Sequence, residues 1–133
     1  MVKKDNYTQI PIYREIESLY VWLSAVTARA PKIPSWEILC VQIHSDVFHA
    51  LRMAEAGVNT NDPLKKLDYL DRLAEDIKEV KTVFRLFCRM SAHYIPRVVT
   101  PSQERDFYLR MIKIGNNLSH WRNAYLSQEH TVD

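Results

Sequence analysis

The feature that most constrains the fold of this chain is an apolar side chain that recurs every three or four residues over four long stretches. This spacing keeps one face of an α-helix apolar, because successive residues rotate by about 100° around the helix axis. The stretches cover residues 10–30, 35–56, 63–95 and 101–126. No strand pattern competes with them, so we expect an all-α fold. An antiparallel up-down-up-down four-helix bundle buries four such faces most simply.

Proline, glycine and capping residues mark the expected ends of the first two helices. Pro31 and Pro34 end the first helix. Ser35 is the expected N-cap of the second, because its hydroxyl can accept a hydrogen bond from an amide of the first turn. Gly57 is expected to close the second helix in the left-handed conformation.

The last two helices have stronger start signals. Asp62 can cap the third helix, with Pro63 at the first helical position, where the missing amide hydrogen costs nothing. This helix should fail near Pro96. Residues 100–103 (TPSQ) combine an N-cap threonine, a first-turn proline and a reciprocal glutamine, which predicts a capping box at the start of the fourth helix.

The length and composition predict one globular domain spanning residues 1–133. The chain has 133 residues, of which 47% are hydrophobic and 26% charged, so collagen-like, disordered and multi-domain organisations are excluded. Residues 1–9 and 127–133 are expected to be frayed ends. No apolar run reaches the roughly 18 residues of a membrane helix, and no signal peptide is visible. We therefore expect a cytoplasmic protein with no membrane partner.

The charges are segregated along the chain although the formal net charge is only +2. Residues 78–122 contain nine basic and three acidic side chains, whereas residues 1–77 contain nine basic and eleven acidic ones. Lys78, Lys81, Arg85 and Arg89 fall within an arc of roughly 80° on the third helix, where only Glu79 is expected to pair with them. We call these four cations the basic ridge.

A cationic surface with few acidic partners most often binds phosphate, because neutralising each phosphate releases counterions. The alternative is a solvated helix face with no partner. We favour nucleic-acid binding. The expected contact residues on the third and fourth helices are Lys78, Lys81, Arg85, Arg89, Arg110, Lys113 and Arg122.

A second surface is predicted on the third helix, where Val83, Leu86 and Met90 lie together outside the main apolar stripe. In a solitary bundle they would be exposed. We expect them to form an oligomer interface. The alternatives are scattered surface residues, or an apolar stripe that neighbouring helices make wider.

Catalysis finds little support in the sequence. With only 2 Gly there is no phosphate-cradling loop or dinucleotide fingerprint, and Cys40 and Cys88 are expected to be buried free thiols. The histidines show no metal-ligand spacing with a carboxylate. We therefore expect no enzyme activity, no metal and no cofactor.

Three segments resemble a known family, the small four-helix-bundle proteins that include the accessory variability determinant of diversity-generating retroelements and the proteins encoded in intervening sequences of bacterial 23S ribosomal RNA. Residues 84–89 (FRLFCR) are similar to its helix-three segment, in which two arginines four apart alternate with apolar residues. Residues 99–103 (VTPSQ) are similar to the capped start of its last helix, and residues 114–121 (IGNNLSHW) to its glycine-then-tryptophan ending.

The resemblance implies a homopentamer that binds RNA and DNA through its basic surface. It further implies a reverse transcriptase as partner, with the chain supporting mutagenic complementary-DNA synthesis from a template RNA. Arg85 and Arg89 match the family's basic pair. Two alternatives stay open: an intervening-sequence protein of unknown role, and a structural scaffold that binds only protein.

Overall fold

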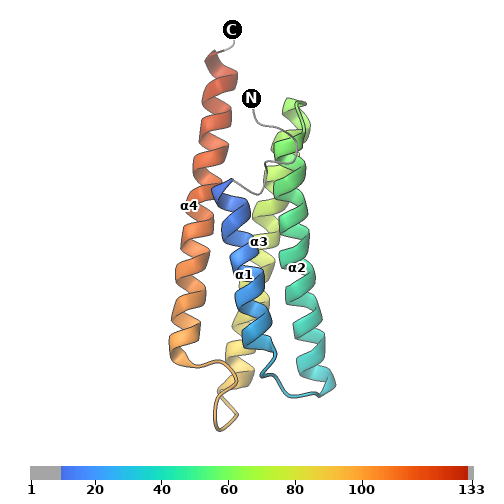
Figure 1. Cartoon of the computed structure of the whole chain (residues 1–133), viewed down its shortest axis with the longest axis vertical. Coiled ribbons are helices and arrows are strands. Elements are labelled where there is room, and N and C mark those ends of the chain that lie inside the picture. The colour runs from blue at the N-terminus through green and yellow to red at the C-terminus, as the bar shows by residue number, and fades with distance from the viewer. Residues whose placement is uncertain (1–9, 132–133) are drawn as a thin grey trace.

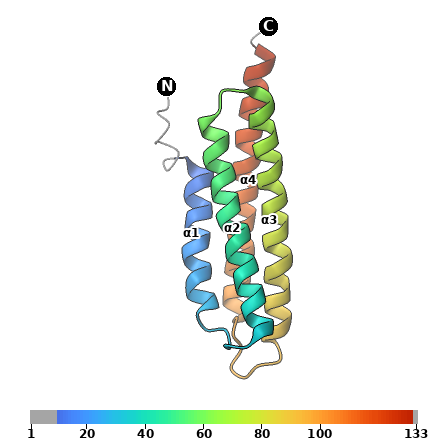
Figure 2. The ribbon, with the colours of Figure 1, turned by 90° about the vertical axis from the view of Figure 1, so that its right-hand side faces the viewer.

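The fold is an antiparallel four-helix bundle, seen in a computed structural model that describes residues 10–131 and the side chains of residues 10–126 (Figures 1 and 2). The helices are α1 (Pro11–Thr27), α2 (Pro34–Asn59), α3 (Pro63–Ser91) and α4 (Pro101–Thr131). Each helix packs against two others, in the order α1, α2, α3, α4 and back to α1. The all-α, up-down-up-down prediction is confirmed.

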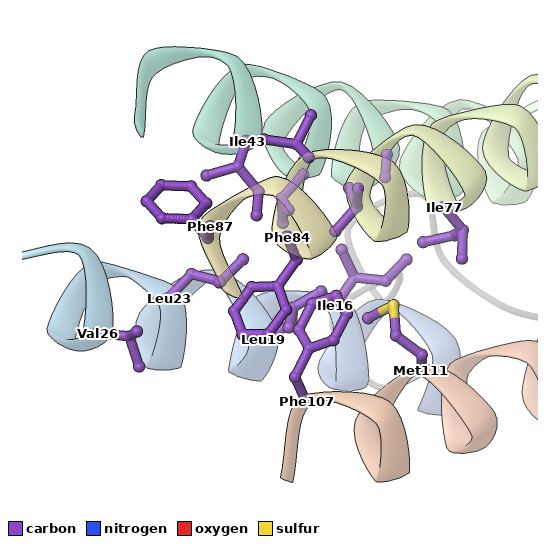
Figure 3. Close-up of a cluster of buried hydrophobic side chains, with 14 of the residues drawn as sticks. Ile16, Leu19, Leu23, Val26, Ile43, Ile77, Phe84, Phe87, Phe107 and Met111 are labelled. Carbon is purple, nitrogen blue, oxygen red and sulfur yellow. The ribbon is translucent and has the colours of Figure 1, made fainter. Parts of the chain in front are cut away.

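The core contains the apolar faces that the sequence predicts. Figure 3 shows side chains from α1, α2, α3 and α4 meeting in one cluster, with Phe84 of α3 against Phe107 of α4. Their rings stack with centroids 3.8 Å apart and planes 10° from parallel. At one end of the bundle the Trp36 indole donates a hydrogen bond of 3.1 Å to the Tyr94 hydroxyl. The indole therefore has a polar partner although Trp36 is fully buried.

The two strongest start signals are confirmed. Asp62 Oδ1 accepts hydrogen bonds from the amides of Leu64 and Lys65, at 3.0 and 3.4 Å. At the start of α4 the Gln103 amide donates to Thr100 Oγ1 at 3.1 Å. In return the Thr100 amide donates to Gln103 Oε1 at 3.0 Å, which completes the capping box.

Two helices end earlier than predicted, and proline explains both. The α1 helix ends at Thr27, not at residue 30, and α3 ends at Ser91, not at residue 95. A proline ring clashes with the carbonyl four residues before it. For Pro31 that residue is Thr27, and for Pro96 it is Ala92, the C-cap of α3. Each proline therefore ends its helix about one turn before its own position in the sequence.

Both predicted ends of the second helix are wrong. Helix α2 begins at Pro34, after the extended N-cap Ile33, because proline fits the first helical position and Ser35 then lies inside the first turn. At the other end Gly57 has no positive φ and the helix continues to Asn59. Helix α4 also extends beyond residue 126, to Thr131, and residues 1–9, the other expected frayed end, lie outside the described residues.

Candidate nucleic-acid interface

The basic ridge lies on the exposed side of α3. All four of its side chains are exposed, and Arg85 and Arg89 lie on the flank of α3 nearer to α4. Lys78 pairs with Glu75, Nζ to Oε1 at 3.3 Å, and not with the expected Glu79. Within the described side chains, no ion pair involves Lys81, Arg85 or Arg89. The cations of these three residues are therefore available to an external anion.

The cations of α4 have a different role from the one predicted by sequence. The Arg110 guanidinium lies 3.5 Å from Asp106, donates a 3.0 Å hydrogen bond to Ser18 Oγ of α1, and stands 5.4 Å from the centre of the Trp22 ring. Lys113 pairs with Glu15 of α1 at 3.2 Å. These contacts connect α4 to α1, so both cations are neutralised within the bundle.

Arg122 is engaged in the same way, since its guanidinium pairs with Asp71 of α3. Both side chains are partly exposed, and the pair joins α3 to α4 beyond the aromatic core. The structure thus brings Lys81, Arg85 and Arg89 together as free cations, and separates from them the three predicted contact residues on α4.

Arg97 lies beside the basic ridge, in the connection between α3 and α4. It lines a surface hollow of about 400 Å³ together with two ridge residues, Arg85 and Arg89. We call this the arginine hollow. Its other lining residues come from the facing ends of the same two helices: Cys88, Ala92, Glu104 and Tyr108.

Ser91 fixes the connection that carries Arg97. Its buried hydroxyl donates to the Val99 carbonyl at 3.2 Å and accepts from the Val99 amide at 2.7 Å. Val98 and Val99 are themselves buried. Arg97 is therefore presented by a segment anchored on both sides. Sequence reasoning missed Arg97 because it follows Pro96, outside any helical face.

Two further side chains of the hollow, Cys88 and Tyr108, are held neutral. Burial raises the pKa of the Cys88 thiol to about 12, with a further contribution from the Glu104 carboxylate that Arg97 opposes. Burial, then Cys88 and Glu104, raise the pKa of Tyr108 against the effect of Arg85. A neutral thiol is a poor nucleophile. The hollow can attract an anion, and its cysteine is not activated for chemistry.

Two histidines, His44 and His49, are engaged elsewhere in the bundle. His44 Nε2 lies 3.0 Å from Thr27 Oγ1, and burial lowers its pKa. His49 Nδ1 lies 2.6 Å from Asp76 Oδ2, joining α2 to α3. In the part of the chain that the structure describes, no three His, Cys, Asp or Glu side chains are grouped so that they could hold a metal ion.

The predicted oligomer surface is only partly exposed. Val83 is buried, with 4% of its surface accessible, so the expectation that it is exposed is wrong. Met90 is half-buried against the core, and Leu86 remains 45% exposed. The reason is the extensive packing between α2 and α3, which widens the covered face of α3. The alternative of a widened stripe therefore accounts for Val83.

An apolar surface that sequence reasoning missed lies on α2. Ile38, Val41 and Phe48 are 68%, 70% and 53% exposed. At 100° per residue they fall on one side of the helix, opposite the buried Ile43 and Val47. We call these three residues the α2 stripe. The sequence does contain a signal for this surface. Its three apolar residues are spaced by three and seven positions, which places them on the side of the helix opposite the core-facing residues.

No helix among residues 10–131 is both long and apolar enough to cross a membrane. Comparison with protein-family models, with curated proteins and with solved structures finds no match for this chain.

Proposed function

We propose that this chain is a non-catalytic, nucleic-acid-binding accessory protein of a diversity-generating retroelement. Its proposed partners are a reverse transcriptase and the RNA and DNA of mutagenic complementary-DNA synthesis, and it works in the cytoplasm without a cofactor. The observation that carries nucleic-acid binding is the set of unpaired cations: Lys81, Arg85 and Arg89 on one exposed face, with Arg97 beside them.

The dimensions of this surface suit a phosphate backbone. Lys81 and Arg89 are eight residues apart, which spans about 12 Å along a helix. One strand of duplex DNA carries a phosphate every ~3.4 Å of axis, so the ridge can contact several phosphates of one strand. The retroelement context itself rests on the three segments that resemble the family.

A salt titration tests phosphate binding. Anisotropy of a labelled RNA hairpin is followed from about 50 to 200 mM salt, and the slope of log K against log salt reports the number of phosphate contacts. The double variant R85A/R89A should reduce the slope by about two. The matched control is R52A/K65A, which removes two exposed cations, one from α2 and one from the start of α3, that form no ion pair within the described side chains. An unchanged slope in R85A/R89A, or an equal loss in the control, contradicts the proposal.

We further propose that the chain forms a homopentamer, with the α2 stripe as a contact between copies. Exposed apolar side chains gathered on one helix face are typical of an interaction surface. Light scattering of the wild type should give about five times the monomer mass, and V41E/F48E should reduce it. L64E, which changes an exposed leucine outside the stripe, is the control. A monomeric wild type contradicts self-association.

A protein-binding scaffold is the second candidate, and the α2 stripe is the observation that favours it. This candidate predicts oligomers or protein complexes without any RNA binding at about 50 mM salt. Within the family, an intervening-sequence protein is the alternative to a retroelement protein. A neighbouring reverse-transcriptase gene with a template repeat indicates the retroelement, whereas a position inside a ribosomal RNA gene indicates the other.

A further inference from the structure

Tyr108 stands between two adjoining hollows of different character. On one side it lines the arginine hollow. On the other it lines a hollow of about 360 Å³ along the outer face of α4, together with Leu109 and Ile112. Pro101, Glu104 and Arg105 complete this second hollow, which we call the apolar hollow. Cations and an apolar surface therefore meet at one aromatic ring.

The Tyr108 ring is held by the core although its side chain reaches the surface. It meets Phe84 edge to face, with ring centroids 6.5 Å apart and planes at 86°. It meets Phe107 in the same way, at 5.2 Å and 84°. The residue nevertheless remains 37% exposed. An aromatic ring that is already oriented loses little conformational freedom when a ligand stacks on it.

The neighbouring apolar side chains extend this platform. Leu109 and Ile112 are each 60% exposed. Arg105, also exposed, lines the same hollow and offers a further cation. A ligand that fills both hollows must therefore carry an anion and a flat apolar group close together.

We propose that this surface binds single-stranded nucleic acid, with a backbone phosphate in the arginine hollow and an adjacent base against Tyr108 and the apolar hollow. The inference rests on the proposed nucleic-acid-binding function and adds the strand class to it. In a duplex the bases are stacked on one another, so their faces cannot lie against Tyr108 and the apolar hollow stays empty. A single strand can place a base on an aromatic side chain, and such stacking does not depend on sequence.

The experiment compares four labelled probes of one sequence by fluorescence anisotropy: a single-stranded RNA, a single-stranded DNA, the RNA duplex, and a single strand in which abasic sites replace the bases. The wild type should bind the base-bearing single strands at least about fivefold more tightly than the abasic strand, which corresponds to one stacked base. Comparing RNA with DNA shows whether the 2′-hydroxyl contributes.

Two variants isolate the ring. Y108L keeps an apolar side chain against Phe84 and Phe107 but removes the aromatic face, and it should lose the fivefold preference. Y108F keeps the ring and should retain it. Thermal unfolding shows whether Y108L remains folded, and if it does not, the wild-type comparison of base-bearing and abasic strands decides alone.

The outcomes separate this inference from the proposed function. Equal wild-type binding to base-bearing and abasic strands overturns base stacking, and the proposed function stands if R85A/R89A still reduces the salt slope. Tighter binding to the duplex than to the single strand also overturns the inference. Absence of binding to all four probes overturns the proposed function as well, and would leave a protein ligand for this surface.

Discussion

The two glycines of the chain provide a matched test of the contact between Gly57 of α2 and the Trp121 side chain of α4. Gly57 and Gly115 both lie inside helices, and neither has a positive φ, so alanine fits both backbones. Replacing a glycine by alanine within a helix is worth about 0.8–1.0 kcal/mol. The surroundings differ. A Cβ at position 115 would meet nothing within 4 Å, whereas one at position 57 would lie 3.1 Å from Cη2 of Trp121.

We therefore expect opposite outcomes from one chemical change. G115A should stabilise the protein by about 1 kcal/mol, because no new contact opposes the gain in helix propensity. In G57A the Trp121 indole must move by a few tenths of an ångström, and overpacking typically costs 1–3 kcal/mol. The net effect of G57A should lie between neutral and a loss of about 2 kcal/mol.

Urea unfolding followed by far-ultraviolet circular dichroism measures both changes, and a common m-value shows that the midpoints can be compared. A third arm, W121F, removes the indole atoms that face position 57. In that background G57A should recover the stabilisation seen for G115A, which makes the coupling between the two sites measurable. If G57A stabilises the wild type as much as G115A does, the close packing of Gly57 on Trp121 is refuted.

Three further predictions concern single side chains. Burial lowers the pKa of His44 below its ordinary 6.5, so the unfolded chain binds a proton at this residue more tightly than the folded chain does. The stability of the fold should therefore decrease as the pH drops below about 6.5, and H44Q should remove this part of the pH dependence. D62A should cost about 1 kcal/mol in urea unfolding, because two first-turn amides of α3 lose their acceptor, and no loss would contradict the cap. The pKa of the Cys88 thiol is raised from 9.0 to about 12, so at pH 8 the folded protein should react with iodoacetamide at least about a hundredfold more slowly at Cys88 than the urea-unfolded chain does. Mass spectrometry of the Cys88 peptide measures both rates, and comparable rates would contradict the burial of the thiol.

The fold was predictable because the signals for it are local. A helix face and a capping box each depend on residues within a few positions of one another, so Asp62 and residues 100–103 were interpreted correctly. The errors at the ends of α1 and α3 were also of local origin. The predicted ranges 10–30 and 63–95 end at the residue before a proline, whereas the proline ring clashes with the carbonyl four residues earlier.

The burial of Val83 could not be predicted in the same way. The sequence of one helix does not show how much of its surface the neighbouring helices cover. The burial of Val83 depends on the close packing of α2 on α3. The α2 stripe was predictable from spacing alone, since Ile38, Val41 and Phe48 lie opposite the core-facing residues. A prediction that assigns a single apolar face to each helix does not include a second one.

The candidate site shows the same division between local and distant information. The exposure of the basic ridge follows from spacing on one helix, but which cations are free depends on residues far along the chain. Lys113 is neutralised by Glu15, and Arg122 by Asp71, in pairs that only the assembled bundle brings together. Charge counting within residues 78–122 therefore overstates the basic surface of α4.

Pairing within the bundle removes cations of α4 from the available charge and leaves a group of free arginines beside α3. The α4 cations Arg110 and Lys113 are bound to α1, whereas, within the described side chains, Arg85, Arg89 and Arg97 remain free and surround one hollow beside α3. Tyr108 stands at the edge of that hollow because it follows Phe107, whose burial turns the next side chain outward. The aromatic core thus sets the position of the platform on which the proposed strand selectivity depends, and a loss of selectivity in Y108L without a loss of salt dependence would separate the two contributions.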